Sequence, residues 1–187
     1  VEVLAYSNRL SSKEYRDVVN GLEEENLGFH YNFSAKSPDG KTTAYITNTR
    51  GQLVVRTRNN ETERISKKAT HGKKLSQIGS GEGLHIAWHP NSNQFSYVIN
   101  EKGEPQLITI RLNEKSFVQK TLFRIDGVLS LDYSGDGRTI VFSGLREGRS
   151  DLYIYRVIGN IQEPLWIDRY DDLDPRFTNG GNSVIFA

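Results

Sequence analysis

The sequence contains no cysteine and no methionine among its 187 residues. Without cysteine the chain forms no disulfide bond, carries no thiolate nucleophile and offers no cysteine ligand to a metal ion. Because methionine is missing and the first residue is Val1, we expect a processed product or a piece of a longer chain.

Long hydrophobic runs and an excess of one charge are missing too. Lys and Arg total 24 against 23 Asp and Glu, so the formal net charge is only +1. Dedicated nucleic-acid binders carry a clear basic excess, so we predict no nucleic-acid partner. No apolar stretch approaches the roughly 20 residues that cross a bilayer, so no transmembrane segment is predicted. Composition indicates a globular protein and no particular activity.

A polar turn followed by a short apolar run recurs along the chain. Four clear copies occur at Ser37–Tyr45, His89–Tyr97, Ser134–Phe142 and Thr178–Phe186, with a partial copy at Val3–Ser7. The copies end near aromatic residues, at Tyr6, Tyr45, Tyr97, Phe142 and Phe186. Their spacing of about 40 to 50 residues is typical of β-propeller blades, which have four short strands each.

Other segments of each repeat also resemble strands. An alternating segment precedes the turn, at Phe29–Ser34, Leu84–Trp88, Val128–Tyr133 and Asp174–Phe177. A third strand is predicted after it, at Gly51–Thr57, Gln106–Leu112 and Asp151–Val157, with weaker fourth strands at Glu61–Ile65 and Lys120–Ile125. Alternation bounded by Gly, Asn, Asp and Pro predicts strands joined by tight turns. Asp39-Gly40 and Asp136-Gly137 are predicted hairpin turns, because glycine accepts positive φ.

We therefore predict an all-β fold, a single β-propeller domain over residues 1–187 built of four-stranded antiparallel blades, about four of them visible. One segment has two interpretations. Ser11–Asn20 begins like a helix capping box, whereas the repeat register places a strand over Tyr15–Val19. Leu152–Tyr155, with its two tyrosines, is predicted to be core between packed blades.

The strings S-P-D-G-K (37–41), G-R-S-D-L-Y-I-Y (148–155) and Y-D-D-L-D-P-R-F (170–177) resemble the TolB-type β-propeller repeat. This repeat is a relative of the WD repeat and occurs in bacterial envelope proteins. The resemblance covers nearly the whole chain and is weakest where Asn91-Ser92 replaces Asp-Gly. It implies a six-bladed ring, of which this chain is an incomplete part, and a periplasmic or cell-envelope location. The alternative is a small ring closed by pairing its terminal strands.

The acidic run Asp168–Phe177 is the main candidate site. Four of its acids are close enough in sequence to share a calcium ion: Asp168, Asp171, Asp172 and Asp174. The resemblance instead implies that D-x-x-P is a structural turn whose aspartate accepts backbone N–H bonds. Aromatic and charged residues of the kind enriched at interfaces lie in the same stretch. We predict a partner-binding site without a metal, formed by Trp166, Arg169, Tyr170, Asp171, Asp172 and Asp174, with calcium as the alternative.

No residue is predicted to be catalytic. His85 and His89 lie on a predicted strand, where residues four apart are separated by about 13 Å, so we expect structural roles for both. Gly79–Gly83 lacks the lysine of a phosphate loop, and no G-x-S-x-G elbow is present. Eight Lys or Arg between Arg50 and Lys74 predict a solvated face; an acidic partner or an anionic membrane surface is the alternative.

The resulting functional prediction is a non-catalytic scaffold of the bacterial envelope that recognises a protein or peptide. The alternative is an accessory or gating domain of a prolyl-oligopeptidase-like hydrolase, with catalytic residues outside this chain. A third interpretation is a carbohydrate-active enzyme that uses carboxylates of the central channel.

Overall fold

The computed structural model describes residues 34–49, 52–65, 85–114 and 116–187. The predictions for Val3–Ser7, Ser11–Asn20 and Gly79–Gly83, and nearly all of the predicted strand Phe29–Ser34, lie outside the described residues. Within these ranges no helix is long and apolar enough to cross a membrane.

Four antiparallel sheets succeed one another along the chain, and we call them blades I to IV. Blade I contains β1 (Ser34–Lys36), β2 (Thr42–Thr49) and β3 (Gln52–Asn59). Blade II contains β4 (Ala87–Trp88), β5 (Gln94–Glu101), β6 (Glu104–Arg111) and β7 (Ser116–Thr121). Blade III contains β8 (Gly127–Tyr133), β9 (Thr139–Arg146), β10 (Arg149–Arg156) and β11 (Ile161–Trp166). Blade IV is the hairpin of β12 (Arg176–Thr178) and β13 (Ser183–Ile185), with the 3-10 turn η1 (Asn179–Gly181) between them.

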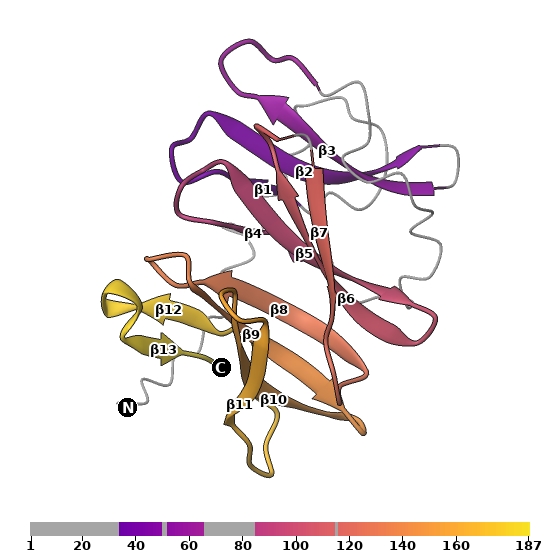
Figure 1. The fold of residues 1–187 in the computed structure, drawn as a ribbon, viewed down its shortest axis with the longest axis vertical. Helices are drawn as coiled ribbons and strands as arrows, with labels where there is room; N and C mark the ends of the chain where they lie inside the picture. Colours follow the sequence, from indigo (N-terminus) through magenta and orange to yellow (C-terminus); the bar gives the residue numbers. More distant parts are fainter. Residues whose placement is uncertain (1–33, 50–51, 66–84, 115) are drawn as a thin grey trace, which may run out of the picture.

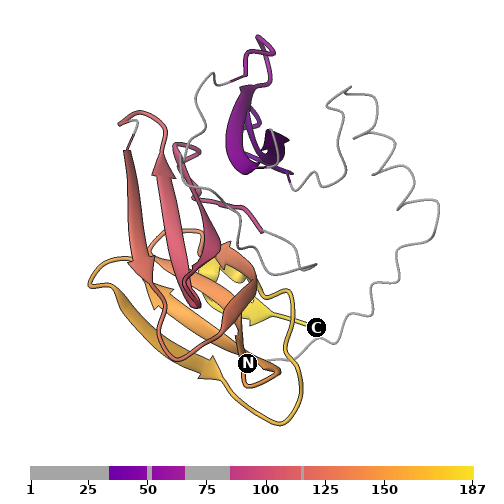
Figure 2. The ribbon, with the colours of Figure 1, turned by 90° about the vertical axis from the view of Figure 1, so that its right-hand side faces the viewer.

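The sheets lie one after another in chain order, as Figure 1 shows from the indigo blade I to the yellow blade IV. The first strands of successive blades, β1, β4, β8 and β12, are neighbours. Figure 2, turned by 90°, shows the same succession of sheets from blade I downward. This arrangement confirms the predicted all-β propeller architecture, and blades II and III have the predicted four antiparallel strands.

Apolar side chains of neighbouring blades pack into two clusters. Between blades I and II, Ala44, Ile46 and Val55 pack with Phe95, Tyr97, Ile108 and Ile110. Between blades II and III, Ala87 and Leu107 pack with Tyr133, Ile140, Phe142, Tyr153 and Tyr155. Blade II therefore buries one face of its sheet against blade I and the other against blade III, and the predicted core role of the two β10 tyrosines is confirmed.

Hydrogen bonds also join the blades. The indole Nε1 of Trp88 donates to the carbonyl of Ala35 at 2.7 Å, which links blade II to blade I. The hydroxyls of Ser96 and Tyr133 lie 2.7 Å apart, which links blade II to blade III. These bonds satisfy polar groups at the blade interfaces that burial would otherwise leave unpaired.

The predicted Asp-Gly hairpin turns are confirmed. In blade III the Asp136 carboxylate accepts bonds from the Ser134 hydroxyl at 2.6 Å and the Arg138 amide at 3.0 Å. Gly137 has a φ of 71°, and a Cβ there would lie 2.0 Å from Nε2 of His89. The His89 imidazole thus fills the space that glycine leaves open, and its Nδ1 accepts a bond from the Asn91 amide. The structural role expected for His89 agrees with these contacts.

The fourth strands are the part of the fold that was predicted wrongly. Glu61–Arg64 forms a turn around the Asn59 side chain instead of a strand, and only Ile65 bridges back to Arg58. The strand predicted at Lys120–Ile125 begins earlier, as β7, and ends at Thr121. Outer strands have little buried surface, so their sequences lack the clear alternation that marks inner strands.

Candidate functional site

The loop that connects β11 to β12 carries most of the predicted site residues. It runs from Ile167 to Pro175, just after Trp166 at the end of β11. The loop joins the outermost strand of blade III to the innermost strand of blade IV, and it passes over the start of β10. We call it the acidic loop, because it contains Asp168, Asp171, Asp172 and Asp174.

Hydrogen bonds at both ends fix the acidic loop to the blades. The Asp172 amide donates to the Ser150 carbonyl at 2.8 Å, and the Ser150 amide donates to Oδ1 of Asp171 at 2.9 Å. Leu173 and Ala187 exchange two backbone bonds of 2.8 and 2.9 Å. Asp168 accepts a bond from the Tyr170 amide at 2.7 Å, which shapes the first turn of the loop. The backbone of the loop is therefore held in one conformation by blades III and IV.

Asp172 is the unusual group of this loop. Its side chain is only 4% exposed, and in the described part of the chain its buried Oδ2 has no hydrogen-bond partner. Burial, together with the nearby charges of Asp168, Asp151 and Asp171, raises the pKa of Asp172 from 3.8 to about 6. The loop thus gathers carboxylates around a buried acid whose charged form is disfavoured.

Exposed aromatic and cationic groups lie around these acids. Trp166 is 52% exposed and Tyr170 is 60% exposed, although both are large side chains. The Arg169 guanidinium carbon lies 4.9 Å from the centre of the Tyr170 ring, and its NH2 group donates to the Tyr170 hydroxyl at 2.6 Å. The Trp166 indole donates to Oδ2 of Asp168 at 3.1 Å. Neighbouring groups thus restrain the side chains of Trp166, Arg169 and Tyr170 while leaving their surfaces open to solvent.

The predicted site residues fall into two groups. Asp171 and Asp172 lie together with Asp168 and with Asp151 of β10, and Asp151 is not among the residues predicted for the site. Asp174 has a φ of 49° and an exposed side chain, and it is not among the acids that act on Asp172. Its charge acts instead on His85 of blade II, whose pKa is lowered by burial and, to a smaller extent, raised again by Asp174. The sequence signal that could have identified Asp151 is an acidic residue inside a predicted strand, directly before the apolar Leu152–Tyr155.

Calcium binding stays an untested prediction. Three carboxylates of this region already accept hydrogen bonds from backbone amides. Asp168 accepts one from Tyr170, Asp171 accepts one from Ser150, and Asp151 accepts one from Asp168. Within the ranges that the structure describes, no three His, Asp or Glu side chains converge in an arrangement suited to hold a metal ion. The carboxylates of this loop that accept backbone N–H bonds are those of Asp168 and Asp171, which precede the D-x-x-P segment Asp172–Pro175.

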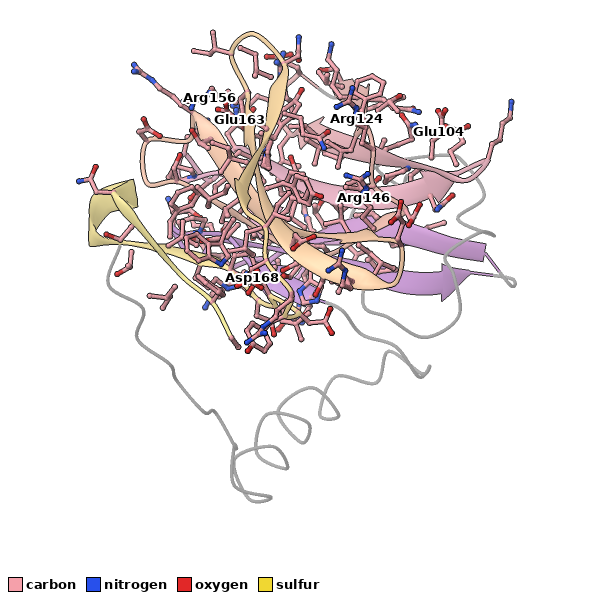
Figure 3. All side chains as sticks on the ribbon, turned by 90° about the horizontal axis from the view of Figure 1, so that it is seen from below. Glu104, Arg124, Arg146, Arg156, Glu163 and Asp168 are labelled. Carbon is pink, nitrogen blue, oxygen red and sulfur yellow. The ribbon has the colours of Figure 1, made fainter. Side chains whose placement is uncertain are left out.

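A groove with a volume of about 320 Å³ lies next to the acidic loop, between blades III and IV. Blade III lines it with Leu152, Ile154, Arg156, Leu165 and Trp166, and blade IV lines it mainly with Phe177, Val184 and Phe186. Arg156 donates from Nε to Glu163 at 2.7 Å, and this pair lies far from Asp168 in Figure 3. Trp166 belongs to both the groove and the surroundings of the acidic loop. The groove cannot be predicted from the sequence, because residues from two blades form it only in the folded chain.

Comparison with known proteins supports the fold through structures and not through sequences. No protein-family model matches this chain. No curated protein matches it either. Among solved structures, TolB from Acinetobacter baumannii aligns with 82% of this chain and 36% of its own, at 16% identity and a TM-score of 0.64. A putative TolB from Agrobacterium tumefaciens aligns with 82% of this chain and 52% of its own, at 21% identity and a TM-score of 0.66.

A tricorn protease also has a similar fold, with a TM-score of 0.59, 14% identity and coverage of 81% of this chain and 14% of its own. These likenesses define the class: the chain is a β-propeller. Its fold is similar to that of the two TolB propellers, in agreement with the resemblance seen in the repeat motifs. The chain spans between about a third and a half of the TolB structures it matches. Because both TolB proteins and a protease share the fold, the fold alone does not decide between binding and catalysis.

Proposed function

We propose that this chain is a non-catalytic recognition module that binds a protein or peptide partner at the acidic loop and its flanking aromatic residues. The observation that carries the proposal is the contrast between a fixed backbone and open side chains. Backbone bonds from Ser150 and Ala187 hold the loop, whereas Trp166 and Tyr170 keep more than half of their surface exposed. A site that is already ordered loses little conformational entropy when a partner binds.

The chemistry of the loop indicates the kind of partner. Tryptophan, tyrosine and arginine dominate the binding energy of protein interfaces, and Trp166, Tyr170 and Arg169 lie within one short segment. The aspartates Asp168, Asp171 and Asp172, with Asp151 beside them, favour a partner that brings a positive charge. We therefore expect a partner segment that contains at least one Lys or Arg next to an apolar or aromatic residue.

A catalytic role for these acids is less well supported. A pKa of about 6 would suit a general acid, but the Oδ2 atom of Asp172 is buried and thus out of reach of a substrate. The Asp168 and Asp171 carboxylates accept bonds from the backbone of the loop and of β10, which is a structural use of their oxygens. The resemblance to envelope proteins supports the proposed periplasmic or cell-envelope location of the module.

Selection from a random peptide library on the purified chain tests the proposed function. We expect enrichment of peptides with Lys or Arg beside an aromatic residue. The affinity of such a peptide should fall by about 10-fold or more in each of the variants Trp166→Ala and Tyr170→Ala. The matched control is Phe117→Ala, which removes another exposed aromatic side chain, on β7 of blade II.

Two results would contradict the proposal. One is a set of selected peptides whose affinities respond to Phe117→Ala and not to the loop variants. The other is turnover of ester, peptide or glycoside substrates that disappears in Asp168→Asn or Asp171→Asn. The second result would favour the role of a domain in a larger hydrolase or a carbohydrate-active enzyme.

A further inference from the structure

Asp172 lies at the point where the acidic loop is attached to blade III. Its amide donates to the Ser150 carbonyl at 2.8 Å, and the Ser150 amide donates to Oδ1 of Asp171 at 2.9 Å. In this attached position the Asp172 side chain is only 4% exposed. Detaching the loop from β10 would break both bonds and bring the Asp172 carboxyl group into water, so attachment and burial go together.

The surroundings of this buried carboxyl group suit its neutral form. In the described part of the chain its Oδ2 has no hydrogen-bond partner, and a buried negative charge without a donor is unfavourable. The charged groups that act on Asp172 are three further acids, namely Asp168 and Asp171 of the loop and Asp151 of β10. Asp151 is also only 4% exposed. A proton on Asp172 therefore removes a buried charge from a cluster of four acids.

The cationic side chains closest to the loop in the sequence have other contacts. Arg169 lies over the Tyr170 ring and donates to its hydroxyl, and Arg176 of β12 donates to two backbone carbonyls. Arg149, the first residue of β10, is exposed. Among the residues that the structure describes, no Lys, Arg or His is one of the groups that act on Asp172. A negative charge on Asp172 thus gains no compensation from this part of the chain.

We propose that Asp172 makes the acidic loop a pH-dependent switch: the loop stays attached to β10 while the side chain is protonated, and it opens more often once the proton is lost. An ionised Asp172 is buried beside three acids in the closed loop and is hydrated in the open loop. Its pKa rises from the ordinary value of 3.8 to about 6 on closure, so the closed loop binds the proton about 100-fold more tightly. By linkage, loss of the proton raises the ratio of open to closed loops by the same factor.

The two pKa values of Asp172 give the direction and the range of the switch. Stabilisation of the closed loop by the proton is complete below about pH 4 and is lost as the pH rises through about 6. The ratio of open to closed loops therefore rises between about pH 4 and pH 7 and is level at higher pH. A use of the switch in regulation rests on the function proposed above, because a partner of the closed loop then competes with opening at neutral pH.

Hydrogen exchange of the free chain at pH 4, 5, 6, 7 and 8 tests the switch without any partner. Dividing each rate by that of an unstructured chain at the same pH gives the protection of each amide. Protection of the Ser150 and Asp172 amides, which join the loop to β10, should fall by about 50-fold between pH 4 and pH 7. Both should remain less protected than Ile108 in the core of blade II, because the loop opens without unfolding of the sheets.

Three variants test the role of Asp172. Asp172→Asn cannot ionise, so the protection of its loop should change by less than about 3-fold over this range. Asp168→Asn removes a neighbouring charge and keeps an oxygen for the Tyr170 amide, so its fall should be smaller than in the wild type. Asp174→Asn is the matched control, because this exposed acid of the same loop does not act on Asp172 and the variant should behave like the wild type.

Carbon-13 NMR of the Asp172 carboxyl group in the wild type measures the midpoint of its titration directly, and we expect about pH 6. Three results would overturn the proposal. A midpoint near pH 4 would show that the folded chain satisfies the ionised carboxylate. Equal pH dependence of loop protection in the wild type and Asp172→Asn would assign the effect to other groups. Loop amides as protected as Ile108 at every pH would make the opening part of global unfolding.

A peptide selected on the chain separates the switch from the proposed recognition role. At pH 7.5 and about 100 times its dissociation constant, a peptide that binds the closed loop should raise the protection of the Asp172 amide by about 100-fold. Unchanged protection, together with the expected pH dependence of the free chain, would support the switch and contradict recognition at the loop. Protection that rises with the peptide but does not depend on pH in the free chain would contradict the switch and support recognition.

Discussion

At the scale of single residues, Asp172 is the side chain whose environment departs most from that of an ordinary aspartate. Its buried carboxylate lies near three other acids, and in the described part of the chain its Oδ2 has no hydrogen-bond partner. The pKa is raised from 3.8 to about 6, so the folded chain holds a proton that the unfolded chain releases in this range. The contribution of protonated Asp172 to the free energy of unfolding is therefore fully present below about pH 4. It is lost as the pH rises through about 6.

The variant Asp172→Asn removes this penalty. We expect it to be more stable than the wild type at pH 7.5 by about 1 to 3 kcal/mol, and nearly equal to it at pH 4. Urea unfolding of both proteins at the two pH values measures the difference. Asp174→Asn is the control, because Asp174 is exposed and should show no such gain. A stability difference for Asp172→Asn that does not change with pH would contradict the account.

Gly137 is a second residue whose identity affects stability, because the fold leaves no room for a Cβ atom there. Its positive φ of 71° and the His89 Nε2 atom, 2.0 Å from where a Cβ would lie, both oppose a side chain. We expect Gly137→Ala to lower the free energy of unfolding by about 2 kcal/mol or more. Gly148→Ala, with a φ of 81° and nothing within 4 Å, should cost only about 1 kcal/mol of backbone strain.

A double variant separates the two causes at Gly137. If the His89 contact matters, part of the loss should be recovered when His89→Ala is combined with Gly137→Ala. Additive losses for the two substitutions, measured by thermal or urea unfolding, would show that the imidazole contact has no part in the effect.

At the scale of elements, inner strands were predictable and outer strands were not. The alternating segment Val128–Tyr133 was placed almost at the bounds of β8, because its side chains alternate between a packed face and a less buried one. β11 escaped prediction, since most of its side chains are exposed and Pro164 interrupts the pattern. The loop residues Trp166 to Asp174 were identified by residue type, whereas their contacts with Ser150 and Asp151 depend on strand pairing that the sequence does not display.

The outer strands are nevertheless held in place by specific bonds. Gln162 of β11 accepts a bond from the Phe123 amide and donates to the Phe123 carbonyl, both at 2.8 Å, which ties blade III to the end of blade II. Gln162→Ala should lower the stability by about 1 kcal/mol and speed hydrogen exchange at the Phe123 amide. Ile161→Ala, which leaves these bonds intact on the same strand, is the comparison. An unchanged rate of hydrogen exchange at the Phe123 amide in Gln162→Ala would contradict a stabilising role for these two bonds.

At the scale of the whole molecule, blades III and IV hold the acidic loop through backbone bonds to Ser150 and Ala187. The resemblance seen in the repeats agrees with the TolB-type fold, although the sequence identities of 16% and 21% are too low to transfer function. Repeat spacing was sufficient for the architecture because each blade repeats the same turn and strand pattern. The groove was not predictable, since it exists only where Leu152, Ile154 and Leu165 of one blade face Val184 and Phe186 of the next.

The charge of the acidic loop predicts how partner binding depends on salt. If cationic groups of the partner approach Asp168 and Asp171, affinity should weaken as ionic strength rises from 20 to 500 mM, by roughly 3- to 10-fold, because exposed charges are screened. Isothermal titration of a selected peptide at several salt concentrations measures this slope. Asp168→Asn should reduce the slope, and an unchanged slope in that variant would place the charge contact elsewhere.

The measurement that most directly tests the central claim is hydrogen exchange of the backbone amides of the free chain. The account requires the acidic loop to be ordered before any partner arrives, through the amides of Asp172, Leu173 and Ala187. It predicts that these amides exchange at least about 100-fold more slowly than in an unstructured chain, close to the rate of Leu152 in β10. Exchange of the three amides at the unstructured rate, with Leu152 protected, would show a loop that orders only on binding and would contradict the proposed preorganised site.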